Sequence, residues 1–311
     1  MSARPEQSVD WIAVDWGTTH LRAWGLSGSD TVVWSGRSAD GMAGLTREEF
    51  EDALLRLIVP VLTDQPVTVV ACGMVGSRQG WVEAPYAAVP SKPLDAPMVR
   101  AKTRDPRLTV HVVAGLKQTN PAADVMRGEE TQIAGFLALN PKFDGVLCLP
   151  GTHSKWAHIS AEEVVSFQTF MTGEIVAALT DQSVLRHSTT GDGWCDEAFA
   201  RGLDETLSRP EKLAASLFSI RAEGLLQGGD PAAARARLSG LLIGAELAAA
   251  KPYWLGQEVA ILGADALARA YGKALEIQGL PATIADADRM TLAGLSAAHG
   301  ALHANLKEHA S

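Results

Sequence analysis

Two short turns rich in glycine and hydroxyl side chains are places where this sequence could bind phosphate. Residues 15–20 read Asp-Trp-Gly-Thr-Thr-His, and residues 149–155 read Leu-Pro-Gly-Thr-His-Ser-Lys. Each turn lies between apolar runs. A glycine in a tight turn lets backbone N–H groups approach an anion closely, and Thr and Ser add hydroxyl donors. Two such turns suit a polyphosphate, with one phosphate bound by each.

The two turns differ in a residue that matters for metal binding. Asp15 precedes the first turn, whereas Leu149 precedes the second. Mg²⁺ keeps most of its waters and takes only one or two protein carboxylates beside phosphate oxygens. We therefore expect Asp15 with Gly17-Thr18-Thr19 to bind Mg²⁺ and the transferred phosphate, and Gly151-Thr152 to bind the remaining phosphates. The alternative is two ordinary hairpin turns, in which Gly and Thr are common. Their repetition between strands favours phosphate binding.

Other residues near these turns are candidates for nucleotide binding. Lys155 and Arg22 could neutralise phosphate oxygens, although each could instead be a solvated side chain on a strand. His153 and Ser154 lie within the second turn and are interpreted as part of it. Gly263-Ala264 is a third glycine turn, between a strand and a helix, where a flat base could lie along the backbone. None of the three turns has the Rossmann or P-loop glycine pattern.

The first half of the chain predicts a hairpin sheet followed by strands and helices. Apolar patterning predicts strands at 11–15, 21–26, 31–34, 67–71 and 108–113. Thr46-Arg47-Glu48-Glu49 is a capping box that should begin a helix. A second helix is expected at 129–139, ended by Asn140-Pro141. Between Gly73 and Pro106 the chain has five prolines and little periodicity, so a long irregular loop with a functional role is expected.

The second half repeats this opening. Strands are predicted at 146–149, 155–159, 259–265 and 282–285, and helices at 210–226, 232–250, 266–277 and 290–306. The pattern indicates an α/β fold of two duplicated lobes with a central cleft. We expect an N-terminal lobe over 1–141 and a C-terminal lobe over 142–311, with the last helix able to pack back on the N-terminal lobe.

Composition excludes several classes of protein. The 311 residues are 47% hydrophobic and 20% charged, which suits a globular protein with a large core. No run of 18 apolar residues and no secretory signal is visible, so we expect a cytoplasmic protein without a membrane partner. A net charge of −9 disfavours nucleic-acid binding. Cys72, Cys148 and Cys195 form no CxxC pair and are expected to be buried thiols.

Longer strings of residues resemble one family of kinases. Asp15 to Thr19, Pro150 to Lys155 and Ile261 to Ala264 resemble the phosphate-1, phosphate-2 and adenosine motifs of the actin/hexokinase/Hsp70 superfamily. More narrowly, the chain resembles 2-dehydro-3-deoxygalactonokinases from about residue 10 to 305. This likeness rests on Gly73 to Ser77, Ala84-Pro85-Tyr86, Val125 to Gln132, Met171 to Glu174 and Ser239 to Glu246. Met-Arg-Gly-Glu-Glu-Thr-Gln and Pro-Gly-Thr-His-x-Lys-Trp are its most specific strings.

The resemblance implies a ribonuclease H-like, actin-like ATPase fold and a defined reaction. The γ-phosphate of ATP, with Mg²⁺, would be transferred to the 6-hydroxyl of 2-keto-3-deoxygalactonate in galactonate or galactose catabolism. The sequence departs from the family pattern mainly at Ser154, where a cysteine can stand.

A carboxylate base for the attacking hydroxyl is expected at Glu129, with Glu130 second. Both begin a helix, where the helix dipole adds positive potential. A related Gly-x-Glu-Glu string supplies the catalytic glutamate in exopolyphosphatases of the same superfamily. The alternative is acidic capping of the first helical turn.

The 2-keto acid needs a cationic or amide group for its carboxylate and hydrogen bonds for its hydroxyls. Gly76-Ser77-Arg78, with Trp81 and Tyr86, could supply that group and an apolar wall. Thr172-Gly173-Glu174 is a second candidate from the other lobe. A loop packed on its own side chains is the alternative for Arg78 and Trp81.

Other functions remain open from the sequence. A related sugar or keto-acid kinase would act on the gluconate epimer. A phosphatase or nucleoside-triphosphate hydrolase of the same fold would hydrolyse ATP without an acceptor. An ATP-gated binding protein would assemble or bind clients, but the chain has no appended peptide-binding lobe. A homo-oligomer is possible.

Overall fold

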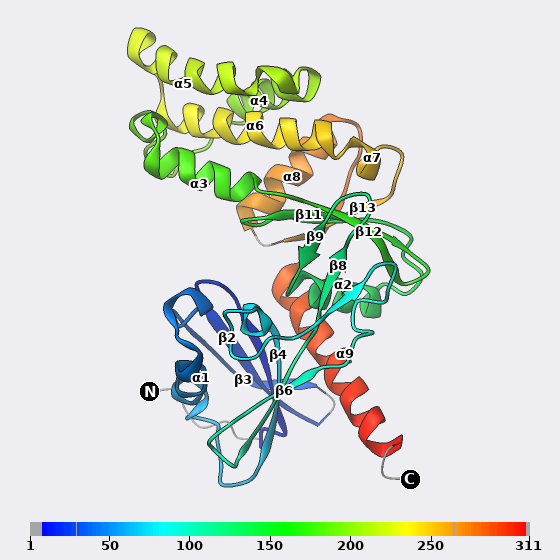
Figure 1. Ribbon diagram of the computed structural model, residues 1–311. Coiled ribbons are helices and arrows are strands. Elements are labelled where there is room, and N and C mark those ends of the chain that lie inside the picture. The colour runs from blue at the N-terminus through cyan, green and yellow to red at the C-terminus, as the bar shows by residue number, and fades with distance from the viewer. Residues whose placement is uncertain (1–7, 29, 264, 309–311) are drawn as a thin grey trace. The chain divides into compact units, whose positions relative to one another are not determined.

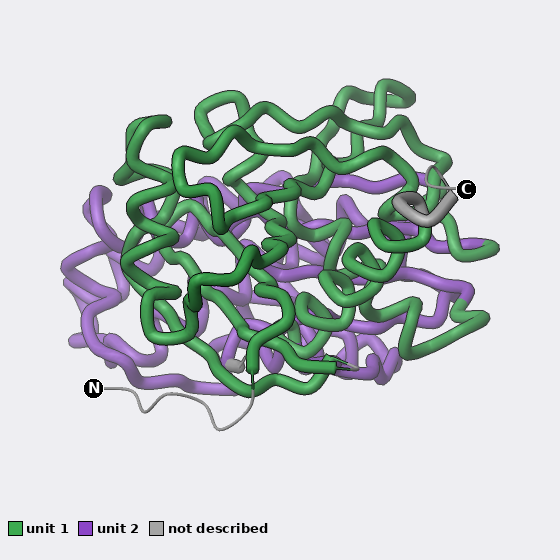
Figure 2. Tube along the Cα trace, turned by 90° about the horizontal axis from the view of Figure 1, so that it is seen from below, with its two compact units in different colours: residues 1–143, 161–165, 287–311 green, residues 144–160, 166–286 purple. Residues whose placement is uncertain are grey.

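The computed structural model describes the chain except for residues 1–7, 29, 264 and 309–311 (Figure 1). It divides into two compact units (Figure 2). Unit 1 consists of the described residues within 1–143, 161–165 and 287–311, and unit 2 of those within 144–160 and 166–286. The chain first passes from unit 1 to unit 2 after Phe143, close to the boundary expected after residue 141. The final helix belongs to unit 1.

A six-stranded sheet forms the centre of unit 1. Its order is β3-β2-β1-β4-β7-β6. The strands are β1 (Trp11–Trp16), β2 (Leu21–Ser27), β3 (Thr31–Ser38), β4 (Val67–Gly73), β6 (Val99–Ala101) and β7 (Leu108–Val112). The first three strands pair antiparallel, and β4 and β7 add parallel to β1. The predicted hairpin and the predicted strands at 67–71 and 108–113 are therefore confirmed.

The two faces of this sheet are covered by different helices. Side chains alternate along β1, so Ile12, Val14 and Trp16 join the core with α1 (Phe50–Ile58). Trp11 and Ala13 join the core with α9 (Ala287–Glu308). Asp15 follows the same alternation and therefore lies on the α9 side. In unit 1, α9 also packs along α2 (Glu129–Leu139), as Figure 1 shows.

Unit 2 repeats the same strand order. Its sheet runs β12-β11-β10-β13-β14. The strands are β10 (Gly145–Leu149), β11 (Ser154–Ser160), β12 (Glu163–Phe170), β13 (Val259–Gly263) and β14 (Thr283–Asp286). A β10–β11 antiparallel pair is followed by β13 and β14, both parallel to β10. The order matches β3-β2-β1-β4-β7 of unit 1. The predicted duplicated α/β fold, with its ribonuclease H-like strand order, is confirmed.

Helices of unit 2 pack on its sheet and on one another (Figure 1). They are α3 (Thr172–Gln182), α4 (Asp196–Ser208), α5 (Leu213–Gln227), α6 (Pro231–Ala249), α7 (Lys251–Trp254) and α8 (Asp265–Ile277). The long α6 contacts α3, α4, α5 and α8. It therefore forms the centre of the helical part of this unit. In the described part of the chain, no helix is both long and apolar enough to cross a membrane.

The segment expected to be one irregular loop contains short strands. β5 (Tyr86–Ala88) pairs with β8 (Gly115–Gln118), which pairs with β9 (Asp124–Met126), giving a small third sheet. Within the same segment, β6 extends the main sheet of unit 1. The expectation of an irregular loop was wrong at these places, because strands of three or four residues are too short to produce a period-2 apolar pattern.

Candidate functional site

The first glycine turn connects β1 to β2 and is held rigidly by backbone hydrogen bonds. The Gly17 N–H donates to the His20 carbonyl at 2.9 Å. Backbone N–H groups of Met42 and Ala43 donate to the carbonyls of Gly17 and Thr18, both at 3.0 Å. The side chains of Thr18 and Thr19 are exposed. The turn thus presents hydroxyl groups to solvent from a fixed backbone, as a phosphate-binding turn requires.

Asp15 forms an ion pair with Arg22, its cross-strand partner on β2. Arg22 also contacts Asp288, at the start of α9, so one guanidinium bridges two carboxylates. The other oxygen of Asp15, Oδ1, lies 3.8 Å from Sγ of the buried Cys72. Burial raises the pKa of Asp15, and the charge of Arg22 opposes this. In this arrangement the Arg22 guanidinium offsets the negative charges of Asp15 and Asp288.

A pocket of 680 Å³ lies over these groups in unit 1. It is lined by residues of the first turn and of the hairpin: Asp15, Gly17, Thr19, His20, Arg22, Trp24, Ser35, Gly36, Arg37 and Asp288. Carboxylates and basic side chains therefore face one polar space. This combination suits a metal ion together with phosphate oxygens.

Glu129 and Glu130 lie at the end of the unit 1 sheet where Asp15 also lies. α2 begins at Glu129, as the sequence predicts, directly after Gly128. Gly73, at the end of β4, has a φ of 90°, and a Cβ there would lie 2.6 Å from the Trp16 carbonyl oxygen. A Cβ on Gly128 would lie 3.4 Å from the Gly73 Cα. The two glycines allow the start of α2 to approach the end of β1, where Asp15 lies.

The two glutamates have different environments. Glu130 is fully buried; its carboxyl accepts hydrogen bonds from the Gly128 N–H at 2.6 Å and the Thr131 hydroxyl at 3.0 Å. Burial, together with the neighbouring charge of Glu129, raises the pKa of Glu130 to about 8. Glu129 is partly exposed and accepts the Arg127 N–H at 3.1 Å. Glu130 therefore holds a proton at neutral pH, and Glu129 is the carboxylate that a substrate can reach.

The raised pKa of Glu130 predicts a dependence of stability on pH. Its folded-state pKa is above the unfolded value of 4.5, so its favourable contribution is complete below pH 4.5 and is lost as pH rises toward about 8. One pH unit corresponds to about 1.4 kcal/mol for one group, which bounds the total at about 5 kcal/mol. Glu130→Gln does not titrate. When the pH is raised from 5 to 8.5, the free energy of unfolding of the variant should therefore increase by at least about 2 kcal/mol relative to that of the wild type.

Urea unfolding of both proteins at the two pH values measures this difference. Comparison with the wild type removes the contributions of Asp15 and Glu246, whose pKa values are also raised. A difference that stays constant with pH would mean that Glu130 has no raised pKa.

The second glycine turn connects β10 to β11 and packs against the start of α3. A Cβ on Gly173 would lie 2.2 Å from the Gly151 carbonyl oxygen, so only glycine permits this approach. The Glu174 N–H donates to the Thr152 carbonyl at 2.9 Å, and Glu174 Oε2 lies 2.6 Å from His153 Nε2. Thr172-Gly173-Glu174, predicted from the sequence as a substrate group, therefore lies beside the second turn within unit 2.

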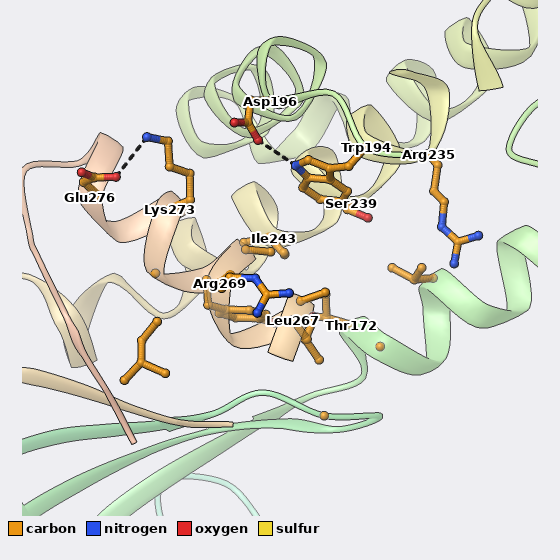
Figure 3. Close-up of a pocket in the computed structure, with 18 of the residues that line it drawn as sticks. Thr172, Trp194, Asp196, Arg235, Ser239, Ile243, Leu267, Arg269, Lys273 and Glu276 are labelled. Atoms are coloured by element: carbon orange, nitrogen blue, oxygen red, sulfur yellow. Dashed lines mark hydrogen bonds and ion pairs between the residues drawn. The ribbon is translucent and has the colours of Figure 1, made fainter. Parts of the chain in front are cut away.

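A larger pocket, of 1110 Å³, lies next to this turn (Figure 3). Gly151, Thr152, Thr172 and Gly173 line one part of it, and the rest is lined by residues of α3, α4, α6, α8 and β14 and of the segments before α4 and β14. In Figure 3 the side chains of Trp194, Arg235, Ser239 and Arg269 surround the space. The sequence did not identify these four as site residues. Ser239 begins one of the strings that resemble the family, whereas no pattern in the sequence indicated Trp194, Arg235 or Arg269.

The third predicted turn lies between β13 and α8. Gly263 is the last residue of β13, and the lining of the larger pocket includes Ala266 and Leu267 from the first turn of α8. Ala264 lies outside the described residues. The predicted adenosine motif is thus adjacent in sequence to helix residues that line this pocket.

Beneath the second turn, Glu246 of α6 connects the elements that line the larger pocket. Glu246 is buried and accepts hydrogen bonds from Trp156 Nε1 at 2.8 Å, from the Tyr271 hydroxyl at 2.7 Å and from the Thr172 hydroxyl. The Tyr271 hydroxyl also lies 2.8 Å from Ser154 Oγ. One carboxylate thereby joins β11, α3 and α8.

We predict different effects for two replacements of Glu246. Glu246→Gln can still accept from Trp156 and donate to the hydroxyls, so it should cost about 1 kcal/mol or less of unfolding free energy. Glu246→Leu leaves the buried donors of Trp156 and Thr172 without an acceptor, while the Tyr271 hydroxyl keeps only Ser154, and should cost about 2 kcal/mol or more. Urea unfolding of the two variants distinguishes them. Equal losses would mean that the hydrogen bonds contribute little.

Lys155 and Ser154 are both buried on β11, so Lys155 is not the solvated strand lysine that was the alternative. Among the substrate candidates of unit 1, Arg78 is 81% exposed and lies 3.6 Å from Glu83. Trp81 is a core residue that packs against Trp16 and Phe50. Trp81 therefore packs on β1 and α1 in the core of unit 1, and not on the side chains of its own loop, which was the alternative.

Gly76 and Tyr86 instead contact a residue that the sequence did not single out, and Ser77 follows Gly76 in the chain. The Arg127 guanidinium lies 4.2 Å from the Tyr86 ring, and its Nη1 lies 2.7 Å from the position of a Cβ on Gly76. Arg127 is part of the specific Met-Arg-Gly-Glu-Glu string. That string could have identified it, but only the fold shows that it meets the 76–86 segment.

Comparison with known proteins gives the family. Residues 15–298 match the family model of 2-keto-3-deoxy-galactonokinase. A relative in Rhizobium meliloti (strain 1021), named a probable 2-dehydro-3-deoxygalactonokinase, is 36% identical over 94% of this chain and 97% of its own. The 2-dehydro-3-deoxygalactonokinase of Escherichia coli (strain K12) is 33% identical over 93% of this chain and 97% of its own.

A solved structure agrees with this result. The crystal structure of a protein from Sinorhizobium meliloti, assigned by its description to the 2-dehydro-3-deoxygalactonokinases, is 36% identical. It superposes with a TM-score of 0.88 and covers 94% of this chain and 99% of its own. The chain belongs to the 2-keto-3-deoxy-galactonokinase family.

Proposed function

We propose that this protein is an ATP-dependent kinase that phosphorylates 2-dehydro-3-deoxy-D-galactonate at its 6-hydroxyl, in galactonate or galactose catabolism. The observation on which this rests is the similarity, over nearly the whole chain, to relatives that are named for this activity. The reaction makes the protein a phosphotransferase with an alcohol acceptor. The site residues of both units fit the requirements of this chemistry.

Asp15 is the residue proposed to hold Mg²⁺. In the described part of the chain, no group of three or more His, Cys, Asp or Glu side chains could enclose a metal ion. Mg²⁺ does not need one, because it takes one or two carboxylates and completes its shell with water and phosphate oxygens. Asp15 faces a polar pocket beside Gly17 and Thr19, which meets that requirement. When bound, Mg²⁺ neutralises charge on the transferred phosphate.

Glu129 is proposed as the general base. Its carboxylate is partly exposed at the start of α2, at the same end of the unit 1 sheet as Asp15. It would accept the proton of the 6-hydroxyl as the oxygen attacks phosphorus. Arg22 would then neutralise negative charge near Asp15, and Thr18 and Thr19 would donate hydrogen bonds to phosphate oxygens.

Unit 2 is proposed to bind the rest of ATP. Its pocket of 1110 Å³ has the size of a ligand site for a molecule as large as a nucleotide. Gly151 and Thr152 at one part of the pocket suit phosphates, with His153, Ser154 and Lys155 close by in the chain. The apolar and aromatic lining from α8 and Trp194 suits an adenine base.

A coupled ADP-release assay tests this function. Mg-ATP is supplied with 2-keto-3-deoxygalactonate, with its gluconate epimer, with free sugars, or without an acceptor. Release that depends on the galactonate compound is the expected result. Release with the gluconate epimer alone would identify a related keto-acid kinase, and release without an acceptor would identify a hydrolase. No release with any compound would contradict a kinase function.

A further inference from the structure

Arg127 is a cation whose hydrogen bonds are incomplete. Its Nη2 donates to the Ala84 carbonyl at 2.7 Å, and its Nε donates to the Tyr86 hydroxyl at 3.3 Å. The guanidinium also stacks 4.2 Å from the Tyr86 ring. Nη1 is buried, and among the described residues it has no hydrogen-bond partner. Three contacts thus fix the side chain, and they leave one nitrogen without an acceptor.

A second buried donor without a hydrogen-bond partner belongs to the residue after the glycine that Arg127 Nη1 approaches. Ser77 is 7% exposed, and its Oγ has no hydrogen-bond partner among the described residues. Gly76 precedes Ser77, and a Cβ on Gly76 would lie 2.7 Å from Arg127 Nη1. A buried donor that is left without an acceptor destabilises the fold. Two such donors around one glycine indicate a place built for an acceptor.

The charge of Arg127 indicates which acceptor would fit. Its partners in the described structure are two backbone carbonyls, a phenol and an aromatic ring, all of them neutral. Among the described residues, Arg127 forms no ion pair with an acidic side chain, whereas Arg78 Nε lies 3.6 Å from Glu83 Oε1. A partly buried guanidinium is stabilised by an anion, and its planar fork matches a carboxylate. The missing acceptor is therefore best supplied by a carboxylate of a ligand.

Arg127 is also placed suitably for the substrate of the proposed reaction. Its backbone N–H donates to the Glu129 carboxylate at 3.1 Å, so the two residues are adjacent. The carboxylate and the 6-hydroxyl are at opposite ends of a six-carbon keto acid, and they require neighbouring but separate groups. We propose that Arg127 Nη1 and Ser77 Oγ bind the carboxylate of the 2-keto acid and select acids over neutral sugars. This inference rests on the proposed function.

A substrate that lacks the negative charge provides the test. The wild type and Arg127→Met are compared with 2-keto-3-deoxygalactonate and with its carboxamide. The Met side chain keeps much of the packing of the Arg stem. We expect Arg127→Met to lower kcat/KM for the acid by about 100-fold, as loss of a charge-assisted pair implies, and for the amide by less than about threefold. KM for ATP should not change. The kcat/KM of Arg127→Lys for the acid should lie between those of the wild type and Arg127→Met. Ser77→Ala should show a smaller loss of kcat/KM, confined to the acid.

Arg47 offers a matched control. Its guanidinium holds the same segment through the carbonyls of Gly80, at 3.1 Å, and Arg78, at 2.6 Å. Arg47→Met should therefore affect acid and amide equally, which is the signature of a structural role. Equal losses of kcat/KM for the acid and the amide in Arg127→Met would mean that Arg127 has only a structural role. A raised KM for ATP would make Arg127 a phosphate-binding residue, and a selective loss in Arg78→Met would move the carboxylate site to Arg78; either result would overturn the proposal.

Calorimetric titration of the wild type and Arg127→Met with the acid, without ATP, separates this inference from the proposed function. Wild-type binding that is lost in Arg127→Met supports the carboxylate site even if no phosphate is transferred. If the wild type phosphorylates the acid and Arg127→Met keeps the same preference for acid over amide, the kinase function stands but the carboxylate site is overturned. Equal binding of acid and amide by the wild type would overturn it as well.

Discussion

Asp15→Asn is expected to lower kcat on the order of 10³-fold while the protein remains folded. The charge stabilisation supplied by a bound metal ion is worth several kcal/mol, and Asp15 is the carboxylate proposed to hold Mg²⁺. Folding should survive because Asn has nearly the same shape and because Arg22 keeps its ion pair with Asp288. Burial already disfavours the charged form of Asp15, raising its pKa, so removing the charge should not destabilise the sheet.

Initial rates with Mg-ATP and thermal unfolding measure the two parts of this prediction. The matched control is Asp10→Asn, one residue before β1, where the carboxylate accepts the Gly28 N–H at 2.6 Å and is exposed. That variant should keep its turnover. A folded Asp15→Asn protein with nearly normal kcat and an unchanged dependence on Mg²⁺ concentration would remove Asp15 from the metal role.

Glu129→Gln is expected to lower kcat by about 10²–10⁴-fold, the range typical for loss of a general base. KM for ATP should change little, because the residues proposed to bind most of ATP belong to unit 2. Glu130→Gln should have a much smaller effect on kcat. Its carboxyl is fully buried and, with a pKa raised to about 8 by burial, holds its proton at neutral pH.

Single-turnover rates of the two variants provide the comparison. They report the chemical step apart from product release. If Glu130→Gln were the more impaired protein, the buried carboxyl would be the catalytic one. Equal and mild losses in both variants would reduce the pair to capping groups for α2.

In the proposed function, the duplication separates two kinds of chemistry. Both units have a glycine turn between the first two strands of their sheets, yet only unit 1 has a carboxylate before it. Unit 1 contains Asp15, Glu129 and Arg127, which suit metal, proton transfer and acid binding. Unit 2 contains the larger pocket, which suits a nucleotide. A repeated fold thus provides two similar turns whose neighbouring residues differ.

Local patterns predicted the elements that position the site. The hairpin around Gly17, the capping box at Thr46 and the start of α2 at Glu129 all depend on residues within a few positions of each other. Short-range spacing is visible in a sequence, and strong local preferences persist in the fold.

Burial and long-range partners could not be predicted in this way. Lys155 is buried on β11, and Trp81 is buried against Trp16 and Phe50, which are distant from it in the sequence. Arg127 meets Tyr86 across 41 positions, and Glu246 meets Trp156 across 90. Nothing in the spacing of these residues predicts such contacts, because they depend on how the strands and helices pack.

Phosphorus NMR of the product tests whether phosphate is transferred to the 6-hydroxyl of the keto acid. Mg-ATP and 2-keto-3-deoxygalactonate are incubated with the protein, and the phosphate position is read from its coupling to carbon-bound protons. We expect one new phosphomonoester, coupled to the two protons on carbon 6 and formed in equal amount to ADP. Inorganic phosphate as the only product, or an ester at another carbon, would contradict it.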